Sequence, residues 1–327
     1  MLLNELHIYK EVFFSSTEEI ELKVKEIPFE IGNGDLVDVH RKKFAHLTFY
    51  DIEYEGGYGV LTKGKRIDLS GEVVCVMIKE PLRISSLGSE ALVQWLARKT
   101  LQKYSLETAI PKVYDIFYMN DSICFSMEFI EGCFPYQFIQ NALSPDITFL
   151  QILSQVAILC YLLQKDILLD HRDLKANNVY IRKKHIKYQI DTGTEIFSLH
   201  CPFQVVLLDF GFACLGNSKR ISKINLAARA MPSIDKCPKI GRDLFHFISS
   251  LWSIPSIREK MTGALQKEIS SWLLYENIDY SKVLKKYQGS DLAFAITGEK
   301  NFEKISLDSI SVLRTIHKTF PDVLKTL

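Results

Sequence analysis

Residues 171–178 read His-Arg-Asp-Leu-Lys-Ala-Asn-Asn and follow the short apolar run 167–169. Two cations, a carboxylate and an amide thus come directly after a segment with the character of a buried strand. An aspartate that accepts a hydroxyl proton needs a rigid loop, a cation near the transferred phosphoryl group and an amide oxygen for a metal ion. Asp173, Lys175 and Asn178 provide these groups within one short loop.

The size and composition of the chain predict an ordinary globular protein with two subdomains. It has 327 residues, which is long for one hydrophobic core, and 47% of them are hydrophobic. Lys and Arg number 40 against 39 Asp and Glu. No net field favours nucleic acid or an anionic membrane, so we expect neither as a partner.

The cysteines and the apolar segments point to an intracellular protein. The seven cysteines form no CxxC motif and no Cys/His cluster with metal-ligand spacing, so we expect reduced, mostly buried thiols. The polar residues near the amino terminus argue against a signal peptide or anchor. The longest apolar stretches, 156–163 and 205–208, are too short to span a bilayer. We therefore expect no membrane span.

The distribution of patterns divides the chain into three parts. Residues 1–45 contain alternating runs, and we interpret them as an extension of unknown role that packs on the next part. Residues 46–130 are strand-rich and contain one helix-like segment, 85–104. Residues 131–327 are mainly helical, with one helix predicted to begin at Pro145 behind the capping residue Ser144.

Two further segments carry groups suited to binding phosphate. Residues 54–60 form a Gly-rich hairpin whose backbone amides could approach phosphates, although a plain turn is the commoner use of such a sequence. A β-branched strand, 71–79, ends on Lys79, and strand alternation places this lysine on the same face as Met77. The alternative is a lysine that reaches out to solvent. Glu90 in the following helix is the carboxylate available to pair with it.

A fourth segment, Val-Val-Leu-Leu-Asp-Phe-Gly at 205–211, places a carboxylate at the end of an apolar strand. Oxygen ligands of this kind suit Mg²⁺, and Gly211 allows the chain to turn directly after Asp209. An Asp-Phe-Gly sequence is common, so this segment is evidence for a phosphate-binding site only in combination with the other three segments.

Taken in order, the Gly-rich hairpin, the strand lysine, HRDLKxxN and DFG resemble the eukaryotic-type protein kinase superfamily over residues 48–250. The sequences of the last two motifs are also similar to those of kinases from large DNA viruses. The resemblance implies an α+β class with a two-lobed protein-kinase-like fold. Its β-rich N-lobe would cover 46–130, and its mainly helical C-lobe would cover 131–327.

The resemblance also implies the catalytic roles. Asp173 would be the base that takes the hydroxyl proton, and Lys175, placed as in Ser/Thr kinases, would stabilise the γ-phosphoryl group. Lys79 would contact the α and β phosphates of ATP and pair with Glu90. The remaining implied positions are Asn178 and Asp209 for Mg²⁺, Asp243 beneath the catalytic loop, and Gly56, Gly57, Gly59, Leu61, Met77, Lys79, Met127, Glu128 and Ile130 for ATP, with Met127 as gatekeeper.

The sequence departs from the family pattern at several places. Tyr54 replaces the first loop glycine, Met77 replaces an alanine, and Gln94 stands where an apolar residue is usual. We interpret the long segment 183–202 as a surface insertion. No Ala-Pro-Glu precedes Asp243, so the platform for a peptide substrate is altered. Arg172 would ordinarily bind an activation-loop phosphate, for which Ser218 or Ser222 is available, but we expect activity without phosphorylation.

We therefore expect a serine/threonine protein kinase that uses ATP and Mg²⁺ and acts on Ser or Thr hydroxyls of a protein substrate. The alternatives are a pseudokinase scaffold and a small-molecule or lipid kinase. We expect an intracellular, cytoplasmic protein, located in the host cytoplasm or the virion if it is viral. The sequence leaves the oligomeric state open.

Overall fold

The computed structural model describes residues 28–38, 40–55, 59–82, 86–216, 224–225, 237–286 and 291–326. The chain forms two compact units. The first contains the described residues up to Ile130 together with Asp209–Gly211 and Ile224–Asn225, and the second begins at Glu131. Several positions singled out in the sequence lie outside the described residues, namely Gly56, Gly57, Ser218, Ser222, 230–235 and the first part, 1–27, of the predicted extension.

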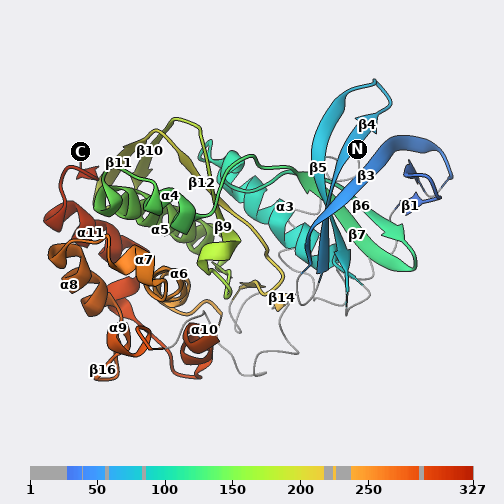
Figure 1. Cartoon of the computed structure of the whole chain (residues 1–327). Coiled ribbons are helices and arrows are strands. Elements are labelled where there is room, and N and C mark those ends of the chain that lie inside the picture. Colours follow the sequence, from blue (N-terminus) through green and yellow to red (C-terminus); the bar gives the residue numbers. More distant parts are fainter. Residues whose placement is uncertain are drawn as a thin grey trace. The chain divides into compact units, whose positions relative to one another are not determined.

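The first unit is built on a closed barrel in the order β1-β2-β3-β4-β5-β7-β6. Its closure depends on β1, which pairs antiparallel with β2 and parallel with β6, where Phe29 lies opposite Tyr118. The two rings stack with their centroids 5.3 Å apart. The strands, seen in Figure 1, are β1 (Phe29–Glu30), β2 (Asp35–Val37), β3 (Lys43–Glu55), β4 (Gly59–Asp68), β5 (Val73–Pro81), β6 (Val113–Met119) and β7 (Ser122–Glu128).

This barrel overturns the predicted kinase-like fold. The α+β mixture of elements is confirmed, but a two-lobed protein-kinase-like fold with its open N-lobe sheet is wrong, because the strands of this unit close on themselves. The reason lies in residues 28–37, which the sequence pattern places in an extension outside the strand-rich part. They supply β1 and β2, and the carbonyl of Pro28 accepts a hydrogen bond from the Tyr118 amide at 2.9 Å.

Alternating residues of the strands fill the barrel interior. The fully buried cluster consists of Leu36, Ala45, Leu47, Val76, Ile78, Phe117 and Cys124. Gly64 lets β3 and β4 approach closely, because a Cβ on it would lie 2.3 Å from the Thr48 carbonyl oxygen. Helix α3 (Gly88–Gln102) packs on β6 and β7 and confirms the helix predicted in 85–104. The short helix η1 (Glu107–Ala109) follows it.

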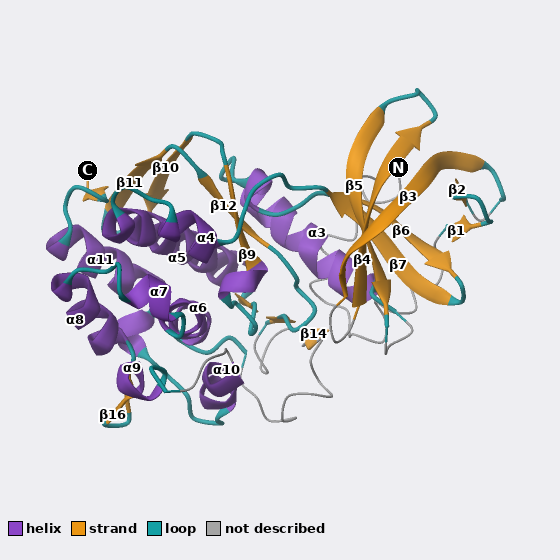
Figure 2. Cartoon of the chain, viewed as in Figure 1, coloured by secondary structure: helices purple, strands orange, loops and turns teal. Residues whose placement is uncertain are grey.

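The second unit is mainly helical, as Figure 2 shows in purple. Helix α5 begins at Pro145 as predicted, although the Ser144 side chain makes no capping hydrogen bond. The other helices are α4 (Pro135–Gln140), η2 (Ala176–Asn178), α6 (Arg242–Trp252), α7 (Pro255–Arg258), α8 (Gly263–Trp272), α9 (Tyr280–Val283), α10 (Asp291–Gly298), η3 (Ile305–Leu307) and α11 (Ser309–Thr319).

Short strands complete the structure. β9 (Val179–Arg182) pairs with β12 (Gln204–Leu207), β8 (Leu169–Asp170) pairs with β13 (Cys214–Leu215), and β15 (Leu274–Tyr275) pairs with β16 (Ile278–Asp279). The last described strands are β10 (Ile186–Asp191), β11 (Ile196–Cys201), β14 (Ile224–Asn225) and β17 (Lys325–Thr326). β10, β11 and β17 form one sheet that buries Tyr188, Ile190, Phe197 and Leu199. The prediction that 183–202 is only a surface insertion is therefore wrong, because one face of this hairpin is packed.

Helix α5 (Pro145–Ile167) is the core helix of the second unit. By length and apolar composition alone it could cross a membrane, but 72% of its most apolar window is buried inside the protein. It contacts α6, α11 and β12. These contacts are those of a core helix in a folded domain, which is compatible with the expectation of no membrane span.

The cysteines correct a second expectation. Cys214 on β13 and Cys237 form a disulfide, so the prediction that all seven are reduced thiols is wrong. The other five, Cys75, Cys124, Cys133, Cys160 and Cys201, are free thiols. Nothing in the spacing of 214 and 237 marked them as a pair, since the contact depends on how β13 and the segment before α6 fold.

Candidate functional site

The site residues predicted from the sequence fall into two groups, one in each unit. In the first unit Lys79 at the end of β5 meets Glu90 in the first turn of α3, with 2.6 Å between Nζ and Oε1. The same Nζ lies 3.0 Å from Oδ1 of Asp209. Strand β5, helix α3 and the distant residue Asp209 thus bring one cation and two carboxylates together.

The charges in this group are unequal. Burial lowers the pKa of Lys79, but the charges of Asp209 and Glu90 outweigh burial and raise it overall, so the lysine is protonated. Burial raises the pKa of Glu90 to about 7 against the opposing effect of Lys79, and Asp209 adds to the rise. When Glu90 has lost its proton, the one lysine faces two charged carboxylates, and the remaining negative charge favours a further cation beside Asp209.

Gly211 is required by the geometry around Asp209. Asp209 has a left-handed backbone with φ of 58°. The Gly211 amide donates to Asp209 Oδ1 at 3.3 Å. A Cβ on Gly211 would lie 3.0 Å from a Glu90 carboxylate oxygen and 3.2 Å from Asp209 Oδ1. A side chain at this position would crowd both carboxylates, which explains the glycine after Asp-Phe.

The residues predicted to contact ATP lie on the strands next to Lys79. Leu61 on β4 is opposite Lys79, and Met77 on β5 is opposite Met127 on β7. Gly59 allows β4 to approach β5, since a Cβ on it would lie 2.9 Å from the carbonyl oxygen of residue 80. The structure thus gathers Leu61, Met77, Lys79 and Met127 on three neighbouring strands.

Gln94 is polar but fully buried, and the structure shows how it is accommodated. Its Nε2 donates to the Pro111 carbonyl at 3.0 Å and lies 3.5 Å from the thioether sulfur of Met127. The departure from an apolar residue is therefore satisfied by a backbone acceptor beside the predicted gatekeeper.

The segment Glu128 to Ile130 was predicted to offer backbone groups to adenine. The Glu128 amide donates to the Lys112 carbonyl at 2.8 Å, and the Phe129 amide donates to the Cys75 carbonyl at 3.4 Å. These two amides are engaged within the unit. Of the three amides in the segment, that of Ile130 remains the candidate donor to a ligand.

In the second unit the loop after β8 and the short helix η2 place Asp173, Lys175 and Asn178 together. Lys175 Nζ donates to Asp173 Oδ2 at 2.8 Å, and Asn178 Nδ2 donates to the same oxygen at 3.0 Å. Asn178 Nδ2 also donates to the Asp173 carbonyl at 2.7 Å, which turns its amide oxygen the other way. The side-chain donors from the described residues reach Oδ2, and Oδ1 remains to accept a proton.

Helix α6 supports this loop through Asp243, as the resemblance implied. Its carboxylate accepts hydrogen bonds from the amides of His171 and Arg172, both at 2.8 Å. The His171 ring donates through Nε2 to the Leu208 carbonyl at 2.8 Å. Arg172 has a left-handed backbone with φ of 66°. Two carboxylate contacts thus fix an unfavourable backbone conformation directly before Asp173.

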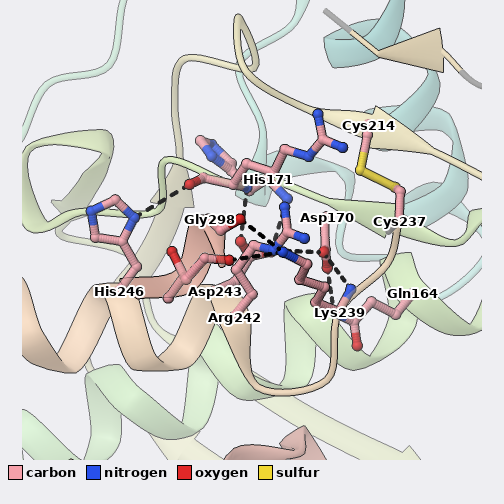
Figure 3. A network of polar contacts seen from close by, with 12 residues as sticks. Gln164, Asp170, His171, Cys214, Cys237, Lys239, Arg242, Asp243, His246 and Gly298 are labelled. Atoms are coloured by element: carbon pink, nitrogen blue, oxygen red, sulfur yellow. Dashed lines mark hydrogen bonds and ion pairs between the residues drawn. A yellow bond between two sulfur atoms is a disulfide. The ribbon is translucent and has the colours of Figure 1, made fainter. Parts of the chain in front are cut away.

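Asp170 is a buried carboxylate that the sequence analysis missed (Figure 3). It accepts hydrogen bonds from the Lys239 amide at 2.7 Å and the Gln164 side chain at 2.9 Å, and Arg242 Nε lies 3.4 Å from it. Burial and the nearby Asp243 raise the pKa of Asp170 to about 7. Its place directly before His171 was the one sequence signal that could have marked it.

Lys239 was missed as well. Its Nζ donates to the carbonyls of Thr297 at 3.1 Å, Gly298 at 3.4 Å and Glu299 at 2.7 Å, at the carboxyl end of α10. Cations favour this end of a helix, where carbonyls lack partners. Lys239 therefore connects α10 to the segment that contacts Asp170.

Arg172 does not present its charge at the surface. Its side chain is fully buried, with 1% exposed. A buried guanidinium is not positioned to bind a phosphate at the surface. Ser218 and Ser222, the residues available for phosphorylation, lie outside the described residues.

Among the described residues, no three His, Cys, Asp or Glu side chains gather in a metal-binding cluster. Mg²⁺ bound with a nucleotide needs only one or two carboxylates besides phosphate and water oxygens, so a three-residue cluster is not required for it. No family model matches the sequence, and no curated protein matches it significantly. The functional argument therefore depends on the residues themselves.

Proposed function

We propose that this protein is a serine/threonine protein kinase that transfers the γ-phosphoryl group of Mg·ATP to a protein hydroxyl. The observation that carries the proposal is the Asp173 carboxylate, of which one oxygen is held by Lys175 and Asn178 while Oδ1 is left to accept a proton. A base with this arrangement suits a hydroxyl nucleophile.

Each residue of the loop has a distinct role in this proposal. Asp173 orients the substrate hydroxyl and takes its proton on Oδ1. Lys175 is a third exposed at its side chain, so its ammonium group can also offset charge on the transferred phosphoryl group. The spacing of Lys175 two residues after Asp173 supports a Ser or Thr hydroxyl, as the resemblance implied.

The groups in the first unit fit a magnesium nucleotide. Lys79, held by Glu90, would contact the phosphates, and the Asp209 carboxylate suits a divalent cation. Asp209 would be a protein ligand of Mg²⁺ in this unit. When bound, Mg²⁺ neutralises charge on the phosphate oxygens, and the chain's own residues position the reactants.

The test is an assay of the purified chain with γ-labelled ATP, Mg²⁺ and a generic protein substrate, run beside Asp173→Asn. We expect label on the protein as phosphoserine or phosphothreonine, and a loss of about a hundredfold or more in the variant. Asp166→Asn, on a side chain at the end of α5 outside the catalytic loop, is the control and should retain activity.

The other outcomes separate the alternatives. ATP binding without transfer to any acceptor would indicate a pseudokinase. Transfer to small alcohols or lipids but not to protein would indicate the small-molecule kinase. Either result contradicts the proposal.

A further inference from the structure

Helix α6 holds the loop 171–178 at three positions along one face. Asp243 accepts the amides of His171 and Arg172, and one turn later His246 Nδ1 lies 3.3 Å from the Arg172 carbonyl oxygen. A further turn along, Ser250 Oγ accepts the amide of Ala176 at 2.8 Å. Residues spaced by three and four lie on the same side of a helix, so these contacts form one stripe. His246 was not singled out in the sequence.

The contact with the Arg172 carbonyl determines which ring nitrogen of His246 carries the proton. A carbonyl oxygen only accepts hydrogen bonds, so Nδ1 must donate. Burial lowers the pKa of His246 to about 4, against the opposing effect of Asp173, so the ring is neutral near pH 7 and Nε2 has no proton. Nε2 has no hydrogen-bond partner among the described residues and lies 4.0 Å from Oδ1 of Asp173.

The surroundings of the ring are known on its other sides. The side chain is fully buried. Phe294 from α10 lies with its ring centroid 6.1 Å away, and the charges that act on the imidazole belong to Asp173, Lys175 and His171. The Nδ1 edge therefore faces the backbone of the loop, and the Nε2 edge faces the carboxylate (Figure 3 shows the first of these contacts).

We propose that His246 is a positioning residue for Asp173. Asp243 fixes the amide of Arg172 and His246 fixes its carbonyl, so both peptide groups around this left-handed residue are held. The second of these peptides leads into Asp173 and sets the direction of its side chain. Because Nε2 is an acceptor, the ring donates nothing to Oδ1, and that oxygen stays open to the substrate proton.

The part of this inference that concerns catalysis rests on the proposed function. The anchoring of the loop by His246 does not depend on that function. Two variants separate the anchor from simple packing. His246→Phe keeps an aromatic ring but removes the donor, leaving the buried Arg172 carbonyl without it. His246→Asn places an amide nitrogen near the position of Nδ1 and restores the donor, although it fills less volume.

The matched control is Ser249→Ala. Ser249 lies on the same helix, is fully buried, and its hydroxyl has no hydrogen-bond partner among the described residues. Its removal tests whether any change in buried polarity on α6 disturbs the loop.

We expect His246→Phe to lower kcat about tenfold, as for the loss of one buried hydrogen bond, with little change in the KM for ATP. His246→Asn should recover most of the loss even though it packs less well, and Ser249→Ala should match the wild type. Equal loss in Phe and Asn variants would assign His246 to packing alone and overturn the proposal.

Two measurements do not depend on activity. Hydrogen exchange of the peptide covering 171–178 should quicken in His246→Phe and not in Ser249→Ala. Nitrogen NMR of the histidine rings should show His246 as the Nδ1-protonated neutral tautomer. If the wild type transfers no phosphoryl group but both results hold, the proposed function fails and the anchor stands. Unchanged exchange, or an Nε2-protonated ring, contradicts the anchor.

Discussion

The ammonium nitrogen of Lys79 lies 2.6 Å from a carboxylate oxygen of Glu90, and both side chains are buried. This contact links the last part of β5 to the first turn of α3. A buried pair of this kind is costly to break, because removing one partner leaves the other charge unpaired. The unfolding free energy and the proposed phosphate binding therefore depend on the same atoms.

Replacing Lys79 with Met should destabilise the protein and abolish phosphoryl transfer. The variant leaves Glu90 and Asp209 facing each other without the cation, which costs about 3 kcal/mol or more in the free energy of unfolding. Urea unfolding measures the change. The double variant Lys79→Met with Glu90→Leu should recover part of this stability but no activity. A single variant as stable as the wild type would show that the pair contributes nothing.

The stability of the protein should fall as pH rises through the range set by Glu90. Its pKa is raised from 4.5 in the unfolded chain to about 7 in the fold. Between these values the unfolded chain has lost the proton that the folded protein keeps, so deprotonation favours unfolding, by up to about 3 kcal/mol across the range. Unfolding free energies measured from pH 5 to 8 should show this decline.

Glu90→Gln provides the check on this assignment, because an amide does not titrate. The decline should be flatter in Glu90→Gln and unchanged in Glu131→Gln, where the glutamate is exposed. A slope that is the same in all three proteins would rule out Glu90 as its source.

Barrel closure should be sensitive to any side chain at Gly64. A Cβ there would lie 2.3 Å from the Thr48 carbonyl oxygen, so β3 and β4 would have to separate. Gly64→Ala should lower the free energy of unfolding by about 1–3 kcal/mol. Gly263→Ala at the start of α8 is the control, since nothing lies within 4 Å of its added Cβ. Equal melting temperatures for the two variants would contradict the close approach.

Loss of the disulfide should destabilise the second unit. Cys214 and Cys237 are 23 residues apart, and closing a loop of this length stabilises a fold by about 3 kcal/mol in the chain-entropy account. Cys214→Ser should therefore unfold at lower temperature than the wild type in the absence of reductant. In the presence of a phosphine reductant the two should converge, whereas Cys75→Ser, at an exposed thiol, should behave as the wild type in both conditions.

Local sequence patterns predicted the elements that are held by contacts between residues close together in the sequence. The 3.6-residue periodicity placed α3, and Pro145 marked the start of α5. Asp173, Lys175 and Asn178 were expected together because one loop carries all three. Their hydrogen bonds span five residues at most, so tertiary contacts had little left to decide about which of them meet.

Contacts between segments far apart in the sequence could not be predicted from local patterns. Strand β1 is two residues long and has no period to detect, and its pairing with β6 requires Phe29 to find Tyr118. The prediction of a kinase-like sheet is wrong because this pairing closes the barrel. His246 was missed for a similar reason, since a histidine on an apolar helix face has no local signal for the carbonyl it binds.

The sequence by itself determined the chemical groups of the candidate site and the helices and loops that carry them, because these depend on residue type and near neighbours. The tertiary structure alone decided the closure of the barrel, the Cys214–Cys237 bond and the contact of His246 with the Arg172 carbonyl. Each of these depends on a partner that only folding brings within reach. The energy of such a contact depends on both segments together and cannot be predicted from either segment alone.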